Sequence, residues 1–176
     1  MANCTSIALT GVQRDCGANL GGVKQMWLIP DGKLELTYDS DHTKISNIAY
    51  PSGSTTTFSS FAFKPGTAYM NTTLSKDATN GSLFWTTEAY LQFPRMETAK
   101  RVAIKALAEA ECQGVIKDSN GKYWFIGQDE PVEATAGTGQ TGTAKTDGNF
   151  YSMTLTDNSL EPPMEVDATA FETLIG

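Results

Sequence analysis

The chain has 176 residues, a length typical of one domain and sufficient for a sizeable hydrophobic core. Its 13 basic and 20 acidic residues give a net charge of −7, which argues against a nucleic-acid-binding surface, because such a surface needs clustered Lys and Arg. Charged residues are only 19% of the chain, and a polar, uncharged surface suits either a subunit that meets neighbours or an ordinary β-rich domain.

Cysteine content and hydropathy exclude two further classes. Cys4, Cys16 and Cys112 form no CxxC pair, so neither a disulfide framework nor a zinc site is predicted. Cys4 and Cys16 would pair only in an oxidising setting, and we expect reduced, buried thiols. No stretch approaches the roughly 20 apolar residues of a membrane helix, and residues 1–10 lack the pattern of a signal peptide.

The N-terminal part predicts an arm followed by a hairpin. Residues 1–22 are rich in glycine and predict an extended arm or a strand that pairs elsewhere. Residues 23–29 are almost continuously apolar and stop at the turn sequence Pro30-Asp-Gly32. The alternation that follows predicts a returning strand through Leu34, Leu36 and Tyr38.

A long hairpin is predicted from Tyr69 to Phe93. It follows a polar segment, residues 39–60, and a short strand opened by Phe61. Residues 76–81 form the predicted tip, because Asn80-Gly81 favours positive φ. Alternation places one apolar set on a single face: Leu83, Trp85, Ala89, Leu91 and Phe93.

Residues 97–110 change to a helical period, with Pro94 just before them. The apolar stripe consists of Ala99, Val102, Ala103, Ala106, Leu107 and Ala110, while Lys100, Arg101, Lys105 and Glu109 face outward. We expect this helix to lie on the sheet. Its Val102 and Leu107 would then contact the hairpin residues Leu83, Trp85, Leu91 and Phe93.

The C-terminal third predicts further strands and one loop. Residues 115–126 form a second hairpin through Asp118-Ser-Asn-Gly121, and residues 134–149 form a mobile loop in which 140–144 is a candidate short strand. Residues 150–156 alternate as a strand, and 164–176 are expected to dock as an arm on this subunit or the next. The whole is one mainly-β domain, a β-sandwich or half-barrel with one flanking helix.

Catalytic and metal-binding patterns are weak. His42 is the only histidine, and with Asp39 and Asp41 it forms a poor zinc set, so an exposed loop histidine is expected. Residues 129–133 carry Asp129, Glu130 and Glu133, a conceivable glycosidase pair, but aromatic platforms are scarce nearby. Residues 118–121 lack the later carboxylates of a calcium loop. We therefore expect no enzyme, no metal and no cofactor.

Three segments together resemble the major tail tube proteins of tailed bacteriophages. The first is Leu83-Phe-Trp-Thr-Thr-Glu-Ala-Tyr-Leu-Gln-Phe93 with the helix to Ala110, the second Gly114-Val-Ile-Lys-Asp-Ser-Asn-Gly-Lys-Tyr-Trp-Phe-Ile-Gly127. The third is the strand 151–155 after the Gly/Thr-rich stretch. Residues 21–29 are similar to tail proteins of gut Bacteroidales viruses, whereas residues 33–64 and the Cys4–Cys16 region fall outside the likeness.

The resemblance implies a virion tail subunit, made in the host bacterial cytoplasm, that forms stacked hexameric rings around a DNA channel. Its partners would be copies of itself and other tail proteins such as the tape measure and terminator, with DNA only in transit and no membrane. Ring closure also removes the open edges of a long hairpin. We expect the polar hairpin face to line the channel, since a basic lining would retain phosphates. That face carries Thr73, Thr86, Glu88 and Gln92.

Two other classes of function remain open from the sequence. One is a different virion assembly protein, such as a tail terminator, a neck subunit, a distal tail or tail-completion protein, or a capsid-decorating subunit. The other is a carbohydrate-binding β-domain, which is suggested by Thr/Ser/Asn-rich loops together with Trp27, Trp85 and Trp124.

Overall fold

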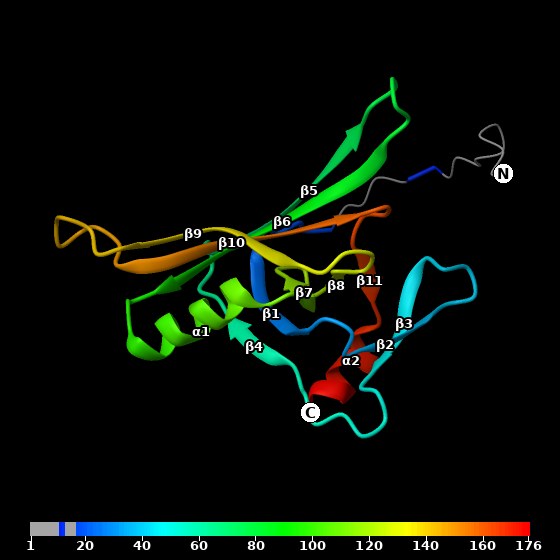
Figure 1. Ribbon diagram of the computed structural model, residues 1–176, viewed down its shortest axis with the longest axis horizontal. Coiled ribbons are helices and arrows are strands. Elements are labelled where there is room, and N and C mark those ends of the chain that lie inside the picture. Colours follow the sequence, from blue (N-terminus) through cyan, green and yellow to red (C-terminus); the bar gives the residue numbers. More distant parts are fainter. Residues whose placement is uncertain (1–10, 13–16) are drawn as a thin grey trace.

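The computed structural model describes residues 11–12 and 17–176 (Figure 1). The fold is mainly β with flanking helices, as the sequence predicts. In chain order the elements are β1 (Val23–Pro30), β2 (Glu35–Tyr38), β3 (Lys44–Ala49), β4 (Ser59–Ala62), β5 (Ala68–Lys76), β6 (Leu83–Pro94), α1 (Thr98–Glu109), β7 (Cys112–Asp118), β8 (Tyr123–Ile126), β9 (Glu133–Gln140), β10 (Phe150–Ser159), β11 (Met164–Val166) and α2 (Ala168–Ile175).

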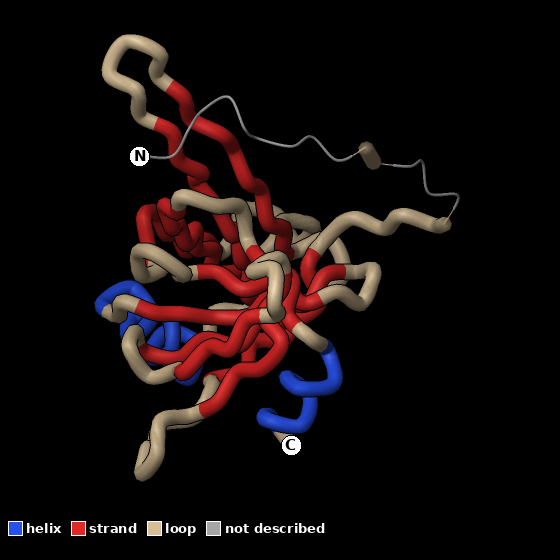
Figure 2. The backbone as a smooth tube through the Cα atoms, turned by 90° about the vertical axis from the view of Figure 1, so that its right-hand side faces the viewer, coloured by secondary structure: helices blue, strands red, loops and turns tan. Residues whose placement is uncertain are grey.

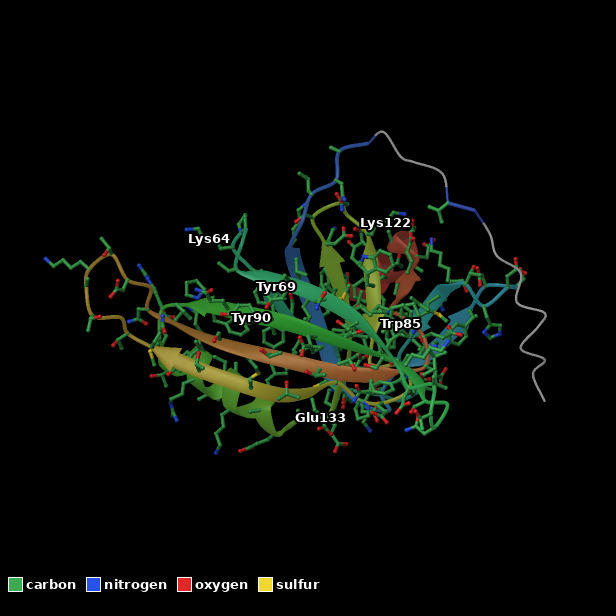
Figure 3. All side chains as sticks on the ribbon, turned by 90° about the horizontal axis from the view of Figure 1, so that it is seen from above. Lys64, Tyr69, Trp85, Tyr90, Lys122 and Glu133 are labelled. Atoms are coloured by element: carbon green, nitrogen blue, oxygen red, sulfur yellow. The ribbon has the colours of Figure 1, made fainter. Side chains whose placement is uncertain are left out.

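The strands form two sheets that pack face to face. One sheet has the strand order β2-β3-β11-β8-β7-β1-β4 and the other β5-β6-β10-β9. A shared hydrophobic cluster joins Met26, Leu28 and Ile116 of the first sheet to Leu91 and Leu155 of the second. The strands of the two sheets cross at a steep angle (Figure 3), as in orthogonal sandwiches.

The other face of the seven-stranded sheet is covered by the C-terminal helix α2. Phe171 on α2 is fully buried and packs edge-on against Trp27 of β1, with ring centroids 5.2 Å apart. Because both faces of this sheet are covered, β1 is buried on both sides, which explains the continuous apolar run in its sequence. No helix within the described residues is long and apolar enough to cross a membrane.

Two predicted hairpins are confirmed and one is wrong. β5 pairs with β6 around residues 77–82, and β7 pairs with β8 around the turn at Asp118. β1 and β2, however, do not pair: β1 lies between β4 and β7, and β2 pairs with β3. A strand buried on both faces needs neighbours on both edges, and the chain supplies them from residues 59–62 and 112–118.

Helix α1 forms where predicted but faces differently. Leu107 is buried in the cluster between the sheets, and Ile104 packs against it, whereas Val102 is 55% exposed. Ala99, Ala103 and Ala106 are exposed as well. The helix is rotated so that Ile104, Leu107 and Ala110 face the body, which leaves Ala99, Val102, Ala103 and Ala106 exposed. The prediction of Val102 as core is therefore wrong.

The predicted C-terminal arm is part of this subunit's own body, and α2 is a second helix that the sequence reasoning missed. β11 joins β3 to β8 inside the seven-stranded sheet. Asp167 caps α2 by accepting the amides of Thr169 and Ala170, each at 3.1 Å. The apolar residues of this segment find their cover beside Trp27, so the segment docks on the subunit that carries it.

The predicted N-terminal arm lies mostly outside the described residues, and Cys4 and Cys16 lie outside them too. The described part, from residue 17 onward, runs along the β7–β8 turn. There the Leu20 amide donates to Asn120 Oδ1 at 2.8 Å, and Asn120 Nδ2 donates to the Leu20 carbonyl at 3.1 Å.

Candidate assembly surface

The outward face of the four-stranded sheet is polar and almost uncharged. Registers place Thr73 opposite Thr86 and Gln92 opposite Ser152, and Glu88 lies opposite both Asn71 and Thr156. All four residues predicted to line a channel, Thr73, Thr86, Glu88 and Gln92, therefore share this face. Within the described strands its outward positions carry two carboxylates, Glu88 and Glu133, and no Lys or Arg.

Hydrogen bonds between side chains of neighbouring strands hold this face together. Thr86 donates to Asn158 Oδ1 at 2.9 Å, and the hydroxyls of Thr138 and Ser152 lie 2.7 Å apart. The hydroxyl of Thr135 lies 2.8 Å from that of Thr156. Cross-strand pairs of this kind fix the sheet face without charged groups.

Aromatic side chains interrupt the polar face, and two of them form a stacked pair. Tyr69 on β5 and Tyr90 on β6 stack, with ring centroids 5.2 Å apart and ring planes at 18° (Figure 3). Tyr69 is 53% exposed, so part of the pair is open to solvent. Exposed tyrosines on a polar surface offer a contact area for a passing or bound molecule.

The edges of the two sheets differ in length. The seven-stranded sheet ends in β2 and β4, each of four residues, whereas the four-stranded sheet ends in β5 with nine residues and β9 with eight. Short edge strands are one way in which proteins avoid unwanted pairing. Neither β5 nor β9 has proline, and lysine occurs only at the last residue of β5, so both leave backbone groups open to a further strand.

β9 is another element that sequence reasoning missed, since residues 134–149 were predicted to be a loop. Its sequence, Glu-Ala-Thr-Ala-Gly-Thr-Gly-Gln, has almost no apolar alternation, because most of its side chains are exposed. Gly139 is required by packing, since a Cβ there would lie 2.9 Å from the Tyr151 ring. A register shift leaves Thr135 as an extra residue, a β-bulge facing Thr154 and Leu155.

The direction of the strands makes the two long edges mutually compatible. Each neighbour in the order β5-β6-β10-β9 is antiparallel, so β5 and β9 run in opposite directions. Rotation about an axis along the strands would therefore bring β9 of one copy beside β5 of the next as an antiparallel pair. Such a rotation repeats the outward face of every copy on the same side of one continuous sheet.

The hairpin residues predicted to lie under α1 are placed differently from one another. Leu91 is buried in the same cluster as Leu107, and Phe93 packs against that cluster. Trp85 is partly exposed, and Leu83 is 51% exposed, so its prediction as core is wrong. β10 ends at Ser159, opposite Trp85, so the hairpin continues past its neighbouring strand, and Leu83 remains half exposed.

Of the candidate chemical groups, the carboxylates Glu130 and Glu133 line one pocket, together with Thr156 and Asp157. His42 is exposed and stacks on Tyr38, as expected for a loop histidine. No group of three or more His, Cys, Asp or Glu side chains in the described part of the chain could hold a metal ion. Burial raises the pKa of the Cys112 thiol, with Asp31 adding to the effect, which disfavours a reactive thiolate.

One buried carboxylate joins the two sheets. Asp157 of β10 is 4% exposed and accepts the backbone amide of Gly127, at the end of β8, at 2.6 Å. Burial raises the pKa of this carboxyl, although the Gly127 amide and the neighbouring Thr87 oppose the shift. This contact links the two sheets.

No family model, curated protein or solved structure matches this chain.

Proposed function

We propose that this protein is a structural tail tube subunit of a tailed bacteriophage, which assembles through the open edges of its four-stranded sheet into rings around a channel. The observation that carries the proposal is the pair of long edge strands, β5 and β9, in a chain whose other sheet ends in short strands. The likeness of its strand and turn sequences to the tail tube family supports the same conclusion.

The outward sheet face supplies the second support. In a ring built by β5–β9 pairing, this face of every copy points the same way, and the channel takes its composition. The carboxylates of Glu88 and Glu133 repel phosphate, and the hydroxyls and amides carry no positive charge that would hold it. DNA therefore passes without being retained. The protein then acts by assembly, without a catalytic group or cofactor, and in the virion.

A second candidate is carbohydrate binding, which the stacked pair of Tyr69 and Tyr90 favours. Both rings lie on a polar face with amide and hydroxyl neighbours, a combination that suits a sugar ring. The long open edges have no part in that function. Assembly accounts for the edges and for the face, so it is the preferred proposal.

The test is the state of the purified protein at rising concentration. We expect rings or tubes by negative-stain microscopy, with a matching rise in mass by light scattering. A tail terminator would stop at one ring, and a sugar-binding domain would stay small and melt at a higher temperature with glycans present. A protein that remains monomeric at millimolar concentration would refute the proposal.

A further inference from the structure

Four large apolar side chains are exposed around the free end of the β5–β6 hairpin. Leu74, Leu83 and Phe84 are 45%, 51% and 38% exposed, and Leu160, just after β10, is 70% exposed. We call these four residues the hairpin knob. The hairpin that carries them projects beyond the rest of the strands (Figure 2). Clustered exposed apolar groups of this kind mark a contact surface.

A second uncovered apolar surface lies along α1. A groove of about 380 Å³ runs between this helix and the β1–β4 edge, and we call it the α1–β4 groove. Its walls are mostly apolar and include Leu28, Pro30, Phe61, Ala103, Ala106 and Leu107. The groove is open because α1 turns Ile104 and Leu107 towards the sheets, which leaves Ala103 and Ala106 exposed.

The charges beside the two surfaces have opposite signs. Asp129 and Glu130 line a groove together with three knob residues, and neither carboxylate forms an ion pair within the described residues. Arg101 and Lys105 are exposed on α1, and Arg101 likewise has no ion pair among described side chains. Glu109 and Glu111 lie at the other end of α1, so complementary contact requires the acidic side of the knob to face Arg101.

We propose that the hairpin knob of one copy docks into the α1–β4 groove of a second copy. The knob projects and the groove is concave, both are apolar, and their flanking charges are complementary. The hairpin projects above the strands and α1 with β4 lies below them (Figure 1), so the two surfaces are separate, and the contact is head-to-tail and leaves a free knob and a free groove on every pair. It uses side chains at the projecting end of the hairpin rather than the backbone edges of β5 and β9, and where those edges form rings, as the proposed function requires, it joins ring to ring.

Two exposed substitutions test this docking. Leu83→Asp removes the knob and Ala106→Glu obstructs the groove, while Leu20→Asp, at an apolar residue of 58% exposure elsewhere, is the matched control. We expect each test variant alone to stop at a single unit, and the control to elongate like the unaltered protein. Circular dichroism and thermal melting confirm that all three variants are folded.

Mixing the two test variants gives the decisive result. One keeps an intact groove and the other an intact knob, so an equimolar mixture should double the mass of the unit and grow no further. A mixture that stays at the single-unit mass, or a single variant that still elongates, overturns the proposal. The exchange Arg101→Glu with Glu130→Arg should restore an association that either substitution alone weakens several-fold.

The same data separate this proposal from the proposed function. If the β5–β9 edges do not pair, the doubled species is a dimer of single copies, and the docking stands while the ring does not. If the docking is wrong, single rings persist and the mixture never doubles.

Discussion

At the scale of the residue, Asp157 shows how a buried carboxylate links stability to pH. Its folded pKa is raised by burial, so the folded state holds the proton more tightly than the unfolded chain. The protein therefore loses stability as pH rises from the ordinary carboxyl range through the folded pKa. The Gly127 amide compensates for only part of the desolvation, because Asp157 Oδ1 has no hydrogen-bond partner among the described residues.

Asp157→Asn should remove this dependence. An amide oxygen can still accept from Gly127 without burying a charge, so the variant should gain in unfolding free energy relative to the unaltered protein as pH rises from 4 towards 7. Urea unfolding at several pH values measures the difference. Asp147→Asn is the control of opposite sign: hydrogen bonds from Ala144 and Thr143 lower the pKa of the Asp147 carboxyl, so its loss should cost stability as pH rises. A pH-independent difference for Asp157→Asn would contradict the interpretation.

At the scale of the element, β9 decides whether the four-stranded sheet can be extended. Successive amides of a strand point to opposite sides, so of Gly137→Pro and Thr138→Pro one removes an amide from the β10 ladder and the other from the open edge. The variant that loses an amide of the β10 ladder should have a lower melting temperature. The variant that loses an amide of the open edge should melt like the unaltered protein yet form no rings by microscopy. Rings from the variant with the unaltered melting temperature would show that β9 is not the contact.

Sequence patterns predicted the elements whose side chains alternate between core and solvent. β6 and β10 were predicted because residues such as Ala89, Leu91, Met153 and Leu155 are buried at every second position. β9 was not, since an edge strand with most side chains exposed has no such alternation. The β1–β2 hairpin was wrong for a related reason: proximity in the chain favoured pairing, but a strand covered on both faces takes its partners from distant segments.

The candidate surface was predicted only in part. Strand alternation alone fixed which hairpin residues point outward, so Thr73, Thr86, Glu88 and Gln92 fall on one face as predicted. It did not show where the neighbouring strand ends, and so Leu83 was assigned to the core. The orientation of α1 depends on both sheets at once, and an alanine-rich stripe does not distinguish a covered face from an open one.

At the scale of the whole molecule, the charge of the outward face should govern what the assembled channel retains. Glu88→Lys with Glu133→Lys places cations on that face without touching the core. We expect normal rings that bind short duplex DNA in low salt, release it in high salt, and slow DNA ejection when built into a virion. Fluorescence anisotropy measures the binding. Glu35→Lys with Glu111→Lys, at two exposed positions outside this sheet, makes the same change in total charge, and equal binding by that control would place the channel elsewhere.

The extra residue Thr135 has a consequence for stoichiometry. A bulge bends its strand and increases the local twist, and this one lies on β9, beside the junction at which one copy would meet the next. The turn made at each junction fixes how many protomers complete a circle. In the proposed ring, the bore diameter would therefore depend on a single inserted threonine, and deleting it should change the symmetry order of the particle while leaving each protomer's core intact.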